Sequence, residues 1–345
     1  MAAASHEVLV IGAGSIGERH IRCFAATGRA RVSFVEVRDE LRNHIAERYA
    51  GMTPFASLEA ALQRRFGAAV IATPAPMHVP QATRLVERGV HVLIEKPLSV
   101  SLAGVDALID AAKARRVVAS VAYVYRAHPV LAEMRDAIRS GRFGRPVELV
   151  AVCGQHFPLY RPAYAQTYYT KHESGGGAVQ DALTHIVNAG QWLVGDVDRV
   201  VGDVAHKVIP NVEVEDTVHV LARHRLDSGG DVLASYSLNQ HQAPNETTIT
   251  VICERGTARF EFHHCLWRSA EEPGGEWTDH GGAALERDTL FIRQADAFLD
   301  AVEGKAPPAC TLEEGMQTLR VNIAILRSAR DRAWVSTAEV NDAVA

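Results

Sequence analysis

The stretch EVLVIGAGSIG at residues 7–17 decides the expected fold. Its apolar run at 7–11 predicts a buried strand, and the pattern at 15–26 predicts a helix. Strand-like apolar runs and amphipathic helical segments then alternate as far as residue 122. Near-continuous apolar strands with helices between them indicate parallel pairing with both faces covered. We therefore expect residues 1–122 to form an α/β domain on a doubly wound parallel sheet of the Rossmann type.

Three glycines in this stretch match G-x-G-x-x-G between the strand and the helix. Gly12 permits the tight turn, Gly14 lets a pyrophosphate approach the backbone, and Gly17 allows close packing of the helix. Ser15 and Ile16 open the helix, whose free N–H groups and positive potential favour phosphates. This context predicts a dinucleotide site, and a purely architectural glycine turn is the alternative.

The end of the second predicted strand carries an acidic residue where the same motif requires one. Glu36 follows Gly17 by about 20 residues, the spacing of the carboxylate that binds a ribose. A carboxylate there accepts hydrogen bonds from the ribose hydroxyls and repels a 2′-phosphate. NAD is therefore favoured over NADP, although the guanidinium of Arg38 is able to pair with a 2′-phosphate.

Two later strand ends also carry polar residues, among them the segment VLIEKP at 92–97. Ligands of open α/β sheets collect outside the carboxyl ends of strands. We expect the cofactor site to include, from these ends, Thr73, Pro74, His78, Glu95 and Lys96. Pro97 biases Lys96 away from helical geometry, so the direction of the lysine is restricted. Its ammonium suits stabilisation of an alkoxide, and an ordinary surface lysine is the alternative.

Beyond residue 122, strand-like segments follow one another with few helices between them. They lie at residues 148–152, 200–208, 215–223, 232–239, 247–253 and 257–262, and helical periodicity returns at 290–302 and 312–329. Strands in succession favour antiparallel pairing. We expect residues 123–345 to form an α+β domain for substrate binding and oligomerisation, with a large, mostly antiparallel open sheet.

A polar stripe runs along one predicted helix of this second part. The segment AVQDALTHIVNAGQWLVG at 178–195 is mostly apolar, yet five polar residues recur at helical spacing: Asp181, Thr184, His185, Asn188 and Gln191. Burying them is costly without partners or a ligand. We therefore expect the helix to face a cleft, with Asp181 and His185 reaching one small molecule. The alternatives are a structural histidine, a metal-binding pair and a solvent-facing stripe.

Composition and charge exclude several classes of protein. The formal net charge is −5, which leaves no global basic field for nucleic acid or acidic lipid. No apolar run approaches the length of a membrane span, and the first residues lack a secretory signal pattern. The cysteines are scattered, which argues against a disulfide scaffold or a zinc site. We expect a cytoplasmic protein with no metal, nucleic-acid partner or membrane partner.

Together these motifs resemble the glucose–fructose oxidoreductase, inositol dehydrogenase and MocA (Gfo/Idh/MocA) family. The segments that carry the likeness are GAGSIGERH (12–20), ATPAPMHVPQA (72–82), GVHVLIEKPLS (89–99), YRAHP (125–129), GGGAVQDALTH (175–185) and the last predicted helix. By this likeness Lys96 matches the lysine of the EKP motif, Asp181 the substrate-positioning aspartate and His185 the acid–base histidine. Many members carry aspartate where this chain has Asn188.

The segment at 154–171 is rich in aromatic rings and hydrogen-bond donors. Such side chains suit sugar hydroxyls or an anionic group, and an ordinary polar loop is the alternative. The full set of expected substrate contacts is Lys96, Tyr123, Arg126, Gln155, Arg161, Tyr168, Asp181 and His185.

The resemblance implies an NAD-dependent dehydrogenase that oxidises a secondary hydroxyl of a sugar, cyclitol or sugar derivative. In that chemistry Lys96 polarises the oxygen, His185 acts as the base, Asp181 orients the substrate, and hydride passes to the nicotinamide. The resemblance also implies a homodimer or homotetramer formed through the C-terminal sheet. Two alternatives stay open: a redox-assisted glycoside hydrolase that recycles NAD in its site, and a non-enzymatic nucleotide-sensing regulator on the same fold.

Overall fold

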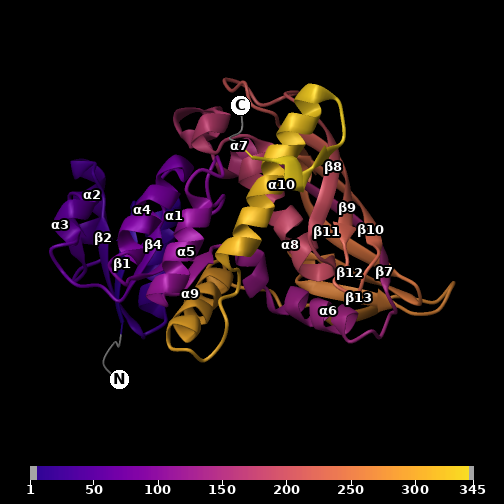
Figure 1. Ribbon diagram of the computed structural model, residues 1–345, viewed down its shortest axis with the longest axis horizontal. Coiled ribbons are helices and arrows are strands. Elements are labelled where there is room, and N and C mark those ends of the chain that lie inside the picture. The colour runs from indigo at the N-terminus through magenta and orange to yellow at the C-terminus, as the bar shows by residue number, and fades with distance from the viewer. Residues whose placement is uncertain (1–5, 342–345) are drawn as a thin grey trace. The chain divides into compact units, whose positions relative to one another are not determined.

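The computed structural model describes residues 6–341, and contacts within the chain divide it into two compact units (Figure 1). The first unit contains the chain up to Ser99, Ala103–Ala127 and Glu286–Gly315. The second contains Val100–Leu102, His128–Leu285 and the chain from Met316. This division differs from the single boundary expected after residue 122, because Glu286–Gly315 returns to the first unit.

A six-stranded sheet forms the centre of the first unit, with the strand order β3-β2-β1-β4-β5-β6. Its strands are β1 (His6–Ile11), β2 (Ala30–Val35), β3 (Thr53–Phe55), β4 (Ala68–Ile71), β5 (His91–Ile94) and β6 (Ala119–Val121). Each neighbouring pair is parallel, which confirms the predicted doubly wound sheet. The strand order reverses between β1 and β4, and ligands of such sheets bind outside the carboxyl ends at that point.

The helices of the first unit cover this sheet with apolar faces. They are α1 (Ser15–Ala26), α2 (Asp39–Arg48), α3 (Leu58–Ala61), α4 (His78–Val86), α5 (Val105–Arg115) and α9 (Thr289–Val302). The helix α9 returns from late in the chain because Phe298 and Leu299 pack in the same core as Phe24 of α1. The helix α3 is a single turn, with Ser57 as its N-cap. The strand β3 was missed because it contains Pro54 and has no apolar run.

A nine-stranded sheet forms the centre of the second unit, with the order β14-β13-β12-β11-β7-β10-β9-β8-β15. Its strands are β7 (Pro146–His156), β8 (Val197–Ala205), β9 (Thr217–Arg225), β10 (Asp231–Asn239), β11 (His241–Cys253), β12 (Gly256–Glu261), β13 (Leu266–Ala270), β14 (Thr278–Gly281) and β15 (Val335–Ser336). The strands β7 and β10 pair in parallel and the other pairs are antiparallel. The large, mostly antiparallel sheet is therefore confirmed.

Helices cover one face of this sheet and leave the other open. The principal helices are α6 (Pro129–Arg139), α8 (Thr184–Val194) and most of α10 (Leu312–Asp331), and α8 packs on β7, β9 and β10. Burial alternates along β9, where Val218 and Val220 are buried while Leu221 is 55% exposed. The sequence pattern missed α6, whose first residue, Pro129, is the last residue of the segment YRAHP (125–129).

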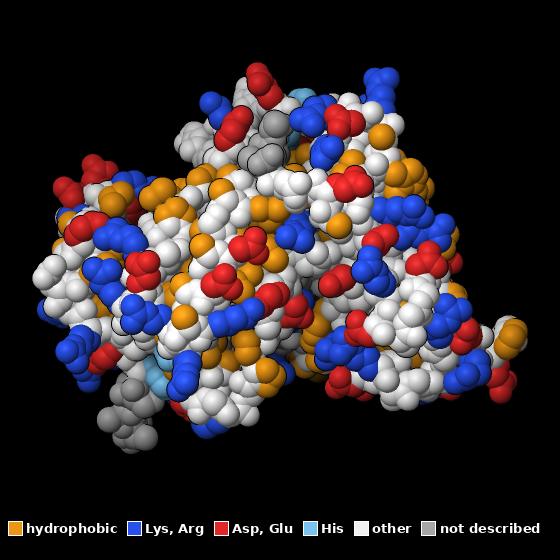
Figure 2. All heavy atoms as spheres, in the orientation of Figure 1, with side chains coloured by type: hydrophobic (Ala, Val, Ile, Leu, Met, Phe, Trp, Pro, Cys, Tyr) orange, Lys and Arg blue, Asp and Glu red, His pale blue; other side chains and the backbone are white. Residues whose placement is uncertain are grey.

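Within residues 6–341, no helix combines the length and the apolar character that a membrane crossing requires. Figure 2 shows acidic and basic side chains interspersed over the visible face of the molecule. That face therefore carries no extended area of a single charge.

Candidate active site

The glycine turn after β1 has the backbone geometry that a dinucleotide requires. Gly12 has a φ of +87°, and a Cβ there would lie 2.8 Å from the carbonyl oxygen of Ala72. A Cβ on Gly17 would lie 1.8 Å from the oxygen of Gly12, so both positions require glycine. A Cβ on Gly14 meets only Arg38, at 4.0 Å, and no side chain caps the helix that Ser15 begins. The open space and free N–H groups therefore fit a pyrophosphate.

Glu36 lies at the end of β2 beside this turn. Its side chain is buried, and its Oε2 accepts a hydrogen bond from the backbone N–H of Ala13 at 3.1 Å. The exposed guanidinium of Arg38 holds both carboxylate oxygens, at 2.9 and 3.2 Å. Burial opposes ionisation of Glu36, but the hydrogen bonds from Arg38 and Ala13 outweigh it and lower the pKa of the carboxyl. The structure thus places the predicted ribose-binding carboxylate next to the glycine turn.

The end of β4 is tied to the end of β5 through a buried histidine. His78 is 1% exposed; its Nε2 lies 2.7 Å from the oxygen of Thr73 and its Nδ1 lies 3.0 Å from the oxygen of Pro97. Burial lowers the pKa of His78. In this structure His78 is thus occupied by two backbone carbonyls, and its contact with the cofactor stays a prediction. Pro74 follows Thr73 and precedes a short 3₁₀ turn.

Lys96 lies just beyond the end of β5 and is half-buried. The preceding residue, Glu95, is 5% exposed, and its Oε2 accepts a hydrogen bond from the backbone N–H of Lys96 at 3.1 Å. The bond between Lys96 and Pro97 is cis. The strand order places β5 next to β4, and β4 next to β1 with its glycine turn. Lys96 and the turn therefore belong to the same edge of the sheet.

Two predicted substrate contacts are buried inside the first unit. Tyr123 is 1% exposed, and the whole of Arg126 is 8% exposed. The guanidinium of Arg126 donates to the oxygen of Ala309 at 2.9 Å and to Glu314 at 2.6 Å. These partners lie in the segment that returns late in the chain, so the sequence could not reveal them. In this structure both side chains are thus enclosed within the first unit, and their contact with the substrate stays a prediction.

The helix that carries Asp181 and His185 begins with a π-helical turn at Val179–Leu183 and continues as α8. Both side chains belong to half-buried residues, unlike most of their neighbours on α8. The start of the helix is held by Glu215, whose Oε1 accepts from the backbone N–H of Val179 at 2.8 Å. A Cβ on Gly177 would lie 2.6 Å from that oxygen, so glycine makes room for the carboxylate.

The polar stripe on this helix faces two different environments. Thr184, Asn188 and Gln191 are buried and bind the polar side chains of α10. Asn188 and Gln191 each donate to the hydroxyl of Thr318 at 2.9 Å, and Asn322 donates to Thr184 at 2.9 Å. The prediction that the whole stripe faces a cleft is therefore wrong for these three residues. Asp181 and His185 lie at its half-buried edge.

The loop between β7 and the π-helical turn brings one predicted contact to Asp181. The hydroxyl of Tyr168 donates to Asp181 Oδ1 at 2.7 Å, and Tyr168 is 46% exposed. Arg161 of the same loop is exposed, and Gln155 near the end of β7 is half-buried. Three aromatic residues of the loop, Phe157, Tyr164 and Tyr169, are buried in one cluster with Ile209, Val212 and Val214, which anchors the loop in the second unit.

Sequence reasoning missed three buried or partly buried side chains beside the predicted residues: His20, His172 and Glu215. His20 of α1 is 0% exposed, and its Nε2 lies 2.6 Å from Glu95 Oε1. His172 lies 2.5 Å from Glu215 Oε2, and this hydrogen bond raises the pKa of His172 above its ordinary value. The signal for His20 was present, since it follows Gly17 by one helical turn. Nothing local marks the pairing of His172 with Glu215.

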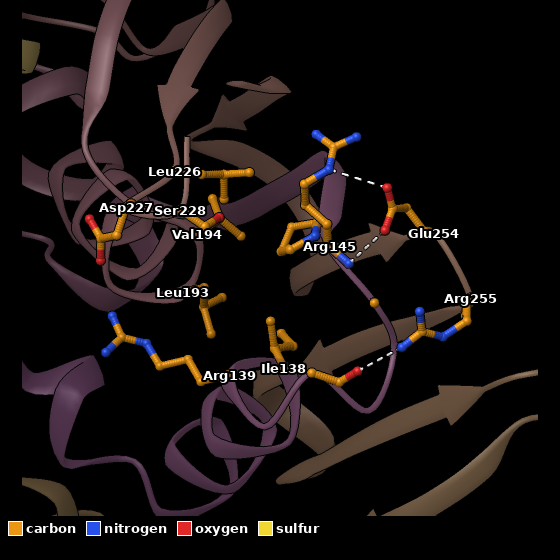
Figure 3. A pocket seen from close by; sticks show the side chains of 14 residues that line it. Ile138, Arg139, Arg145, Leu193, Val194, Leu226, Asp227, Ser228, Glu254 and Arg255 are labelled. Carbon is orange, nitrogen blue, oxygen red and sulfur yellow. Dashed lines mark hydrogen bonds and ion pairs between the residues drawn. The ribbon is translucent and has the colours of Figure 1, made fainter. Parts of the chain in front are cut away.

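A hollow of about 610 Å³ lies in the second unit, and Figure 3 shows the side chains that line it. The apolar side chains in its lining include Ile138, Leu193, Val194 and Leu226. Arg255 at its rim donates to the oxygen of Gly141 just beyond α6, at 3.1 Å, and Arg145 pairs with Glu254. Helix C-termini attract cations, so the fold accounts for a guanidinium there. No predicted site residue lines this hollow, and we assign no ligand to it.

Comparison with known proteins identifies the family. Residues 6–123 match an oxidoreductase family with an NAD-binding Rossmann fold, and residues 131–259 match the GFO/IDH/MocA C-terminal domain. Myo-inositol dehydrogenase Hyg17 of Streptomyces leeuwenhoekii is 28% identical over 330 residues, which cover 93% of this chain and 97% of that protein.

Solved structures agree with this assignment. A levoglucosan dehydrogenase in complex with NADH and levoglucosan has a TM-score of 0.85 at 22% identity, over 97% of this chain and 100% of that chain. The WlbA dehydrogenase from Bordetella pertussis, in complex with NADH and UDP-GlcNAcA, has a TM-score of 0.79 at 26% identity, over 96% and 98% of the two chains. With both halves matched and the predicted fold confirmed, the chain belongs to the GFO/IDH/MocA family of oxidoreductases with an NAD-binding Rossmann fold.

Proposed function

We propose that this oxidoreductase is an NAD-dependent dehydrogenase that oxidises a secondary hydroxyl of a sugar, cyclitol or sugar derivative. The observation that carries the proposal is the edge of the parallel sheet, where Lys96 follows β5 and the glycine turn follows β1, the two strands on either side of β4. The relatives support the substrate class, since they include a myo-inositol dehydrogenase and a levoglucosan dehydrogenase.

The first unit binds the cofactor in this proposal. Backbone N–H groups at the start of α1 bind the pyrophosphate, and Glu36 accepts hydrogen bonds from the ribose hydroxyls. Arg38 neutralises part of the charge of Glu36 and lies where a 2′-phosphate would be added. NAD is therefore preferred, with some tolerance of NADP. When bound, NAD supplies the acceptor for the two electrons that leave the alcohol.

Three side chains act on the substrate in this proposal. The ammonium of Lys96 donates to the reacting oxygen and stabilises the negative charge that develops there. His185 accepts the hydroxyl proton through its imidazole, a group suited to proton transfer near neutral pH. Asp181 orients the substrate, and Tyr168, which already donates to Asp181, holds that carboxylate in place.

The test is a panel of sugars and cyclitols in which NADH formation is measured with the purified protein. Replacing Lys96 or His185 by alanine is expected to slow turnover by about 10²- to 10⁴-fold on the best substrate, as general acid–base catalysis predicts. Lys113→Ala and His44→Ala are matched controls, because both residues are exposed in the first unit and lie outside the site. A Lys96→Ala, His185→Ala double variant that turns over at the full rate contradicts the proposal.

A further inference from the structure

Two buried histidines contact the strand end that carries Lys96, one on each side of it. On the N-terminal side, His20 Nε2 lies 2.6 Å from Glu95 Oε1, and the other oxygen of Glu95 binds the backbone N–H of Lys96. On the C-terminal side, His78 Nδ1 lies 3.0 Å from the oxygen of Pro97. The backbone N–H of Lys96 and the carbonyl of the next residue, Pro97, thus both have partners in the contacts of these two histidines.

Each histidine also connects the strand end of Lys96 with another part of the same sheet edge. His20 lies on α1, the helix that the glycine turn opens. The second ring nitrogen of His78 lies 2.7 Å from the oxygen of Thr73, two residues beyond β4. Because all these residues belong to the first unit, the two histidines link Lys96 to the glycine turn and to the end of β4 within one compact body.

The need to fill the core does not by itself explain why positions 20 and 78 carry histidine and not an apolar residue. His20 and His78 are 0% and 1% exposed, and burying an imidazole costs free energy unless its nitrogen atoms find partners. The Nδ1 of His20 is buried without a hydrogen-bond partner among the described residues. An apolar side chain would avoid that cost at position 20. The compensation that the structure shows is the contact with Glu95.

We propose that His20 and His78 are positioning residues that fix the direction of the Lys96 side chain, acting through the Glu95 carboxylate and the Pro97 carbonyl. The proposal rests on the function assigned to Lys96 above. Neither ring reaches the surface, so both histidines act through their neighbours. Misplacing a catalytic group by about 1 Å is enough to reduce turnover by up to about 100-fold.

Substitution of His78 separates the two contacts of its ring. The amide nitrogen of asparagine takes the place of Nδ1, and that of glutamine takes the place of Nε2. His78→Asn therefore keeps the contact with Pro97, whereas His78→Gln keeps the contact with Thr73. For His20, whose contact uses Nε2, glutamine is the conservative variant and leucine removes the contact.

The readout is the NMR signal of the Lys96 amine after reductive methylation with ¹³C-formaldehyde. The chain has five lysines, so the spectrum is simple, and Lys96→Arg identifies the signal. We expect His20→Leu and His78→Gln to move this signal toward those of exposed lysines. We expect His20→Gln and His78→Asn to restore it. Turnover should fall by about 10- to 100-fold in the first pair, with the KM for NAD changed much less.

The matched control is His224→Leu in the second unit. His224 is also 0% exposed, and its ring contacts the oxygen of Gly195 at 2.6 Å and the hydroxyl of Tyr236 at 2.7 Å. The His224→Leu substitution should leave the Lys96 signal unchanged. An unchanged Lys96 signal in His20→Leu and His78→Gln overturns the proposal, as does an equal effect of the two His78 variants. A full-rate Lys96→Ala variant contradicts the proposed function instead, and the NMR comparison still decides on the two histidines.

Discussion

Two regions of the molecule use the same chemical device beside a predicted catalytic residue, a buried glutamate paired with a histidine. In the first unit, Glu95 pairs with His20 next to Lys96, and the side chains are 7% and 1% exposed. In the second unit, Glu215 pairs with His172 at the start of the helix that carries Asp181 and His185. There the glutamate side chain is 3% exposed and the histidine side chain 32%.

The difference follows from the elements that supply the histidines. His20 lies on α1, whose apolar face packs in the core of the parallel sheet, so water does not reach its ring. His172 lies in a loop of short 3₁₀ turns, where water reaches part of the ring. The first pair therefore fixes a strand end by burial. The second ties down a loop by an interaction that remains open to solvent and to pH.

The largest expected effect is on removal of the glutamates. Glu95→Ala leaves the sealed ring of His20 and the N–H of Lys96 without this acceptor, and we expect a loss of about 3 kcal/mol or more, since each unsatisfied buried group costs about 1–3 kcal/mol. Glu215→Ala should cost less, about 1–2 kcal/mol, because water is able to solvate His172. Hydrogen exchange measured by mass spectrometry reports on each unit separately.

The graded control for this prediction is Glu95→Gln, which keeps one acceptor oxygen and should have an intermediate effect. Equal losses for Glu95→Ala and Glu215→Ala would show that solvent access to the histidine does not decide the cost, and the comparison between the two pairs would fail.

A smaller effect is expected from Gly177→Ala, which disturbs the second pair without removing either member. Gly177 has a φ of +89°, and a Cβ would lie 2.6 Å from Glu215 Oε1. Gly229→Ala is the matched control, because Gly229 has a φ of +87° with nothing within 4 Å of its Cβ position. Each variant should lose about 1–3 kcal/mol through backbone strain. Denaturant unfolding should show a further loss of unfolding free energy for Gly177→Ala alone, because its Cβ meets Glu215. Identical losses for the two variants would mean that the loop shifts to accommodate the Cβ without cost.

The smallest expected effect is a change with pH in the loop around His172. The hydrogen bond to Glu215 outweighs burial and raises the pKa of His172, so the folded protein binds this proton more tightly than the unfolded chain does. The stabilisation is complete below about pH 6.5, the ordinary pKa of histidine, and is lost as the pH rises through the raised pKa.

Hydrogen exchange at Gly175–Val179, corrected for the intrinsic dependence on pH, should therefore accelerate as the pH rises above about 6.5. His172→Gln should remove this acceleration. Peptides from α4 provide the reference, because burial lowers the pKa of His78, the opposite direction to the shift of His172. A wild-type loop whose protection is constant across the range contradicts the assignment.

Several of the predicted site residues were located from the sequence because the signal is local. The glycine turn, Glu36 and Lys96 each lie at a strand end. Short apolar runs mark the strands around them, and apolar residues at helical spacing mark the helices. The polar stripe was also visible in the sequence. The sequence did not show which of its residues have hydrogen-bond partners within the chain. The partner of Asn188 and Gln191 is Thr318. No pattern around Asn188 specifies a residue 130 positions later.

The sequence by itself determined the parallel sheet, the dinucleotide turn and the chemistry available at Lys96, Asp181 and His185, because backbone propensity and turn geometry act over a few residues. Only the tertiary structure decided that Arg126 binds Glu314 and that His20 binds Glu95. A polar residue within an apolar segment indicates from the sequence alone that its side chain needs a hydrogen-bond partner. Whether that partner is a ligand or another part of the chain depends on which distant segment folds against it.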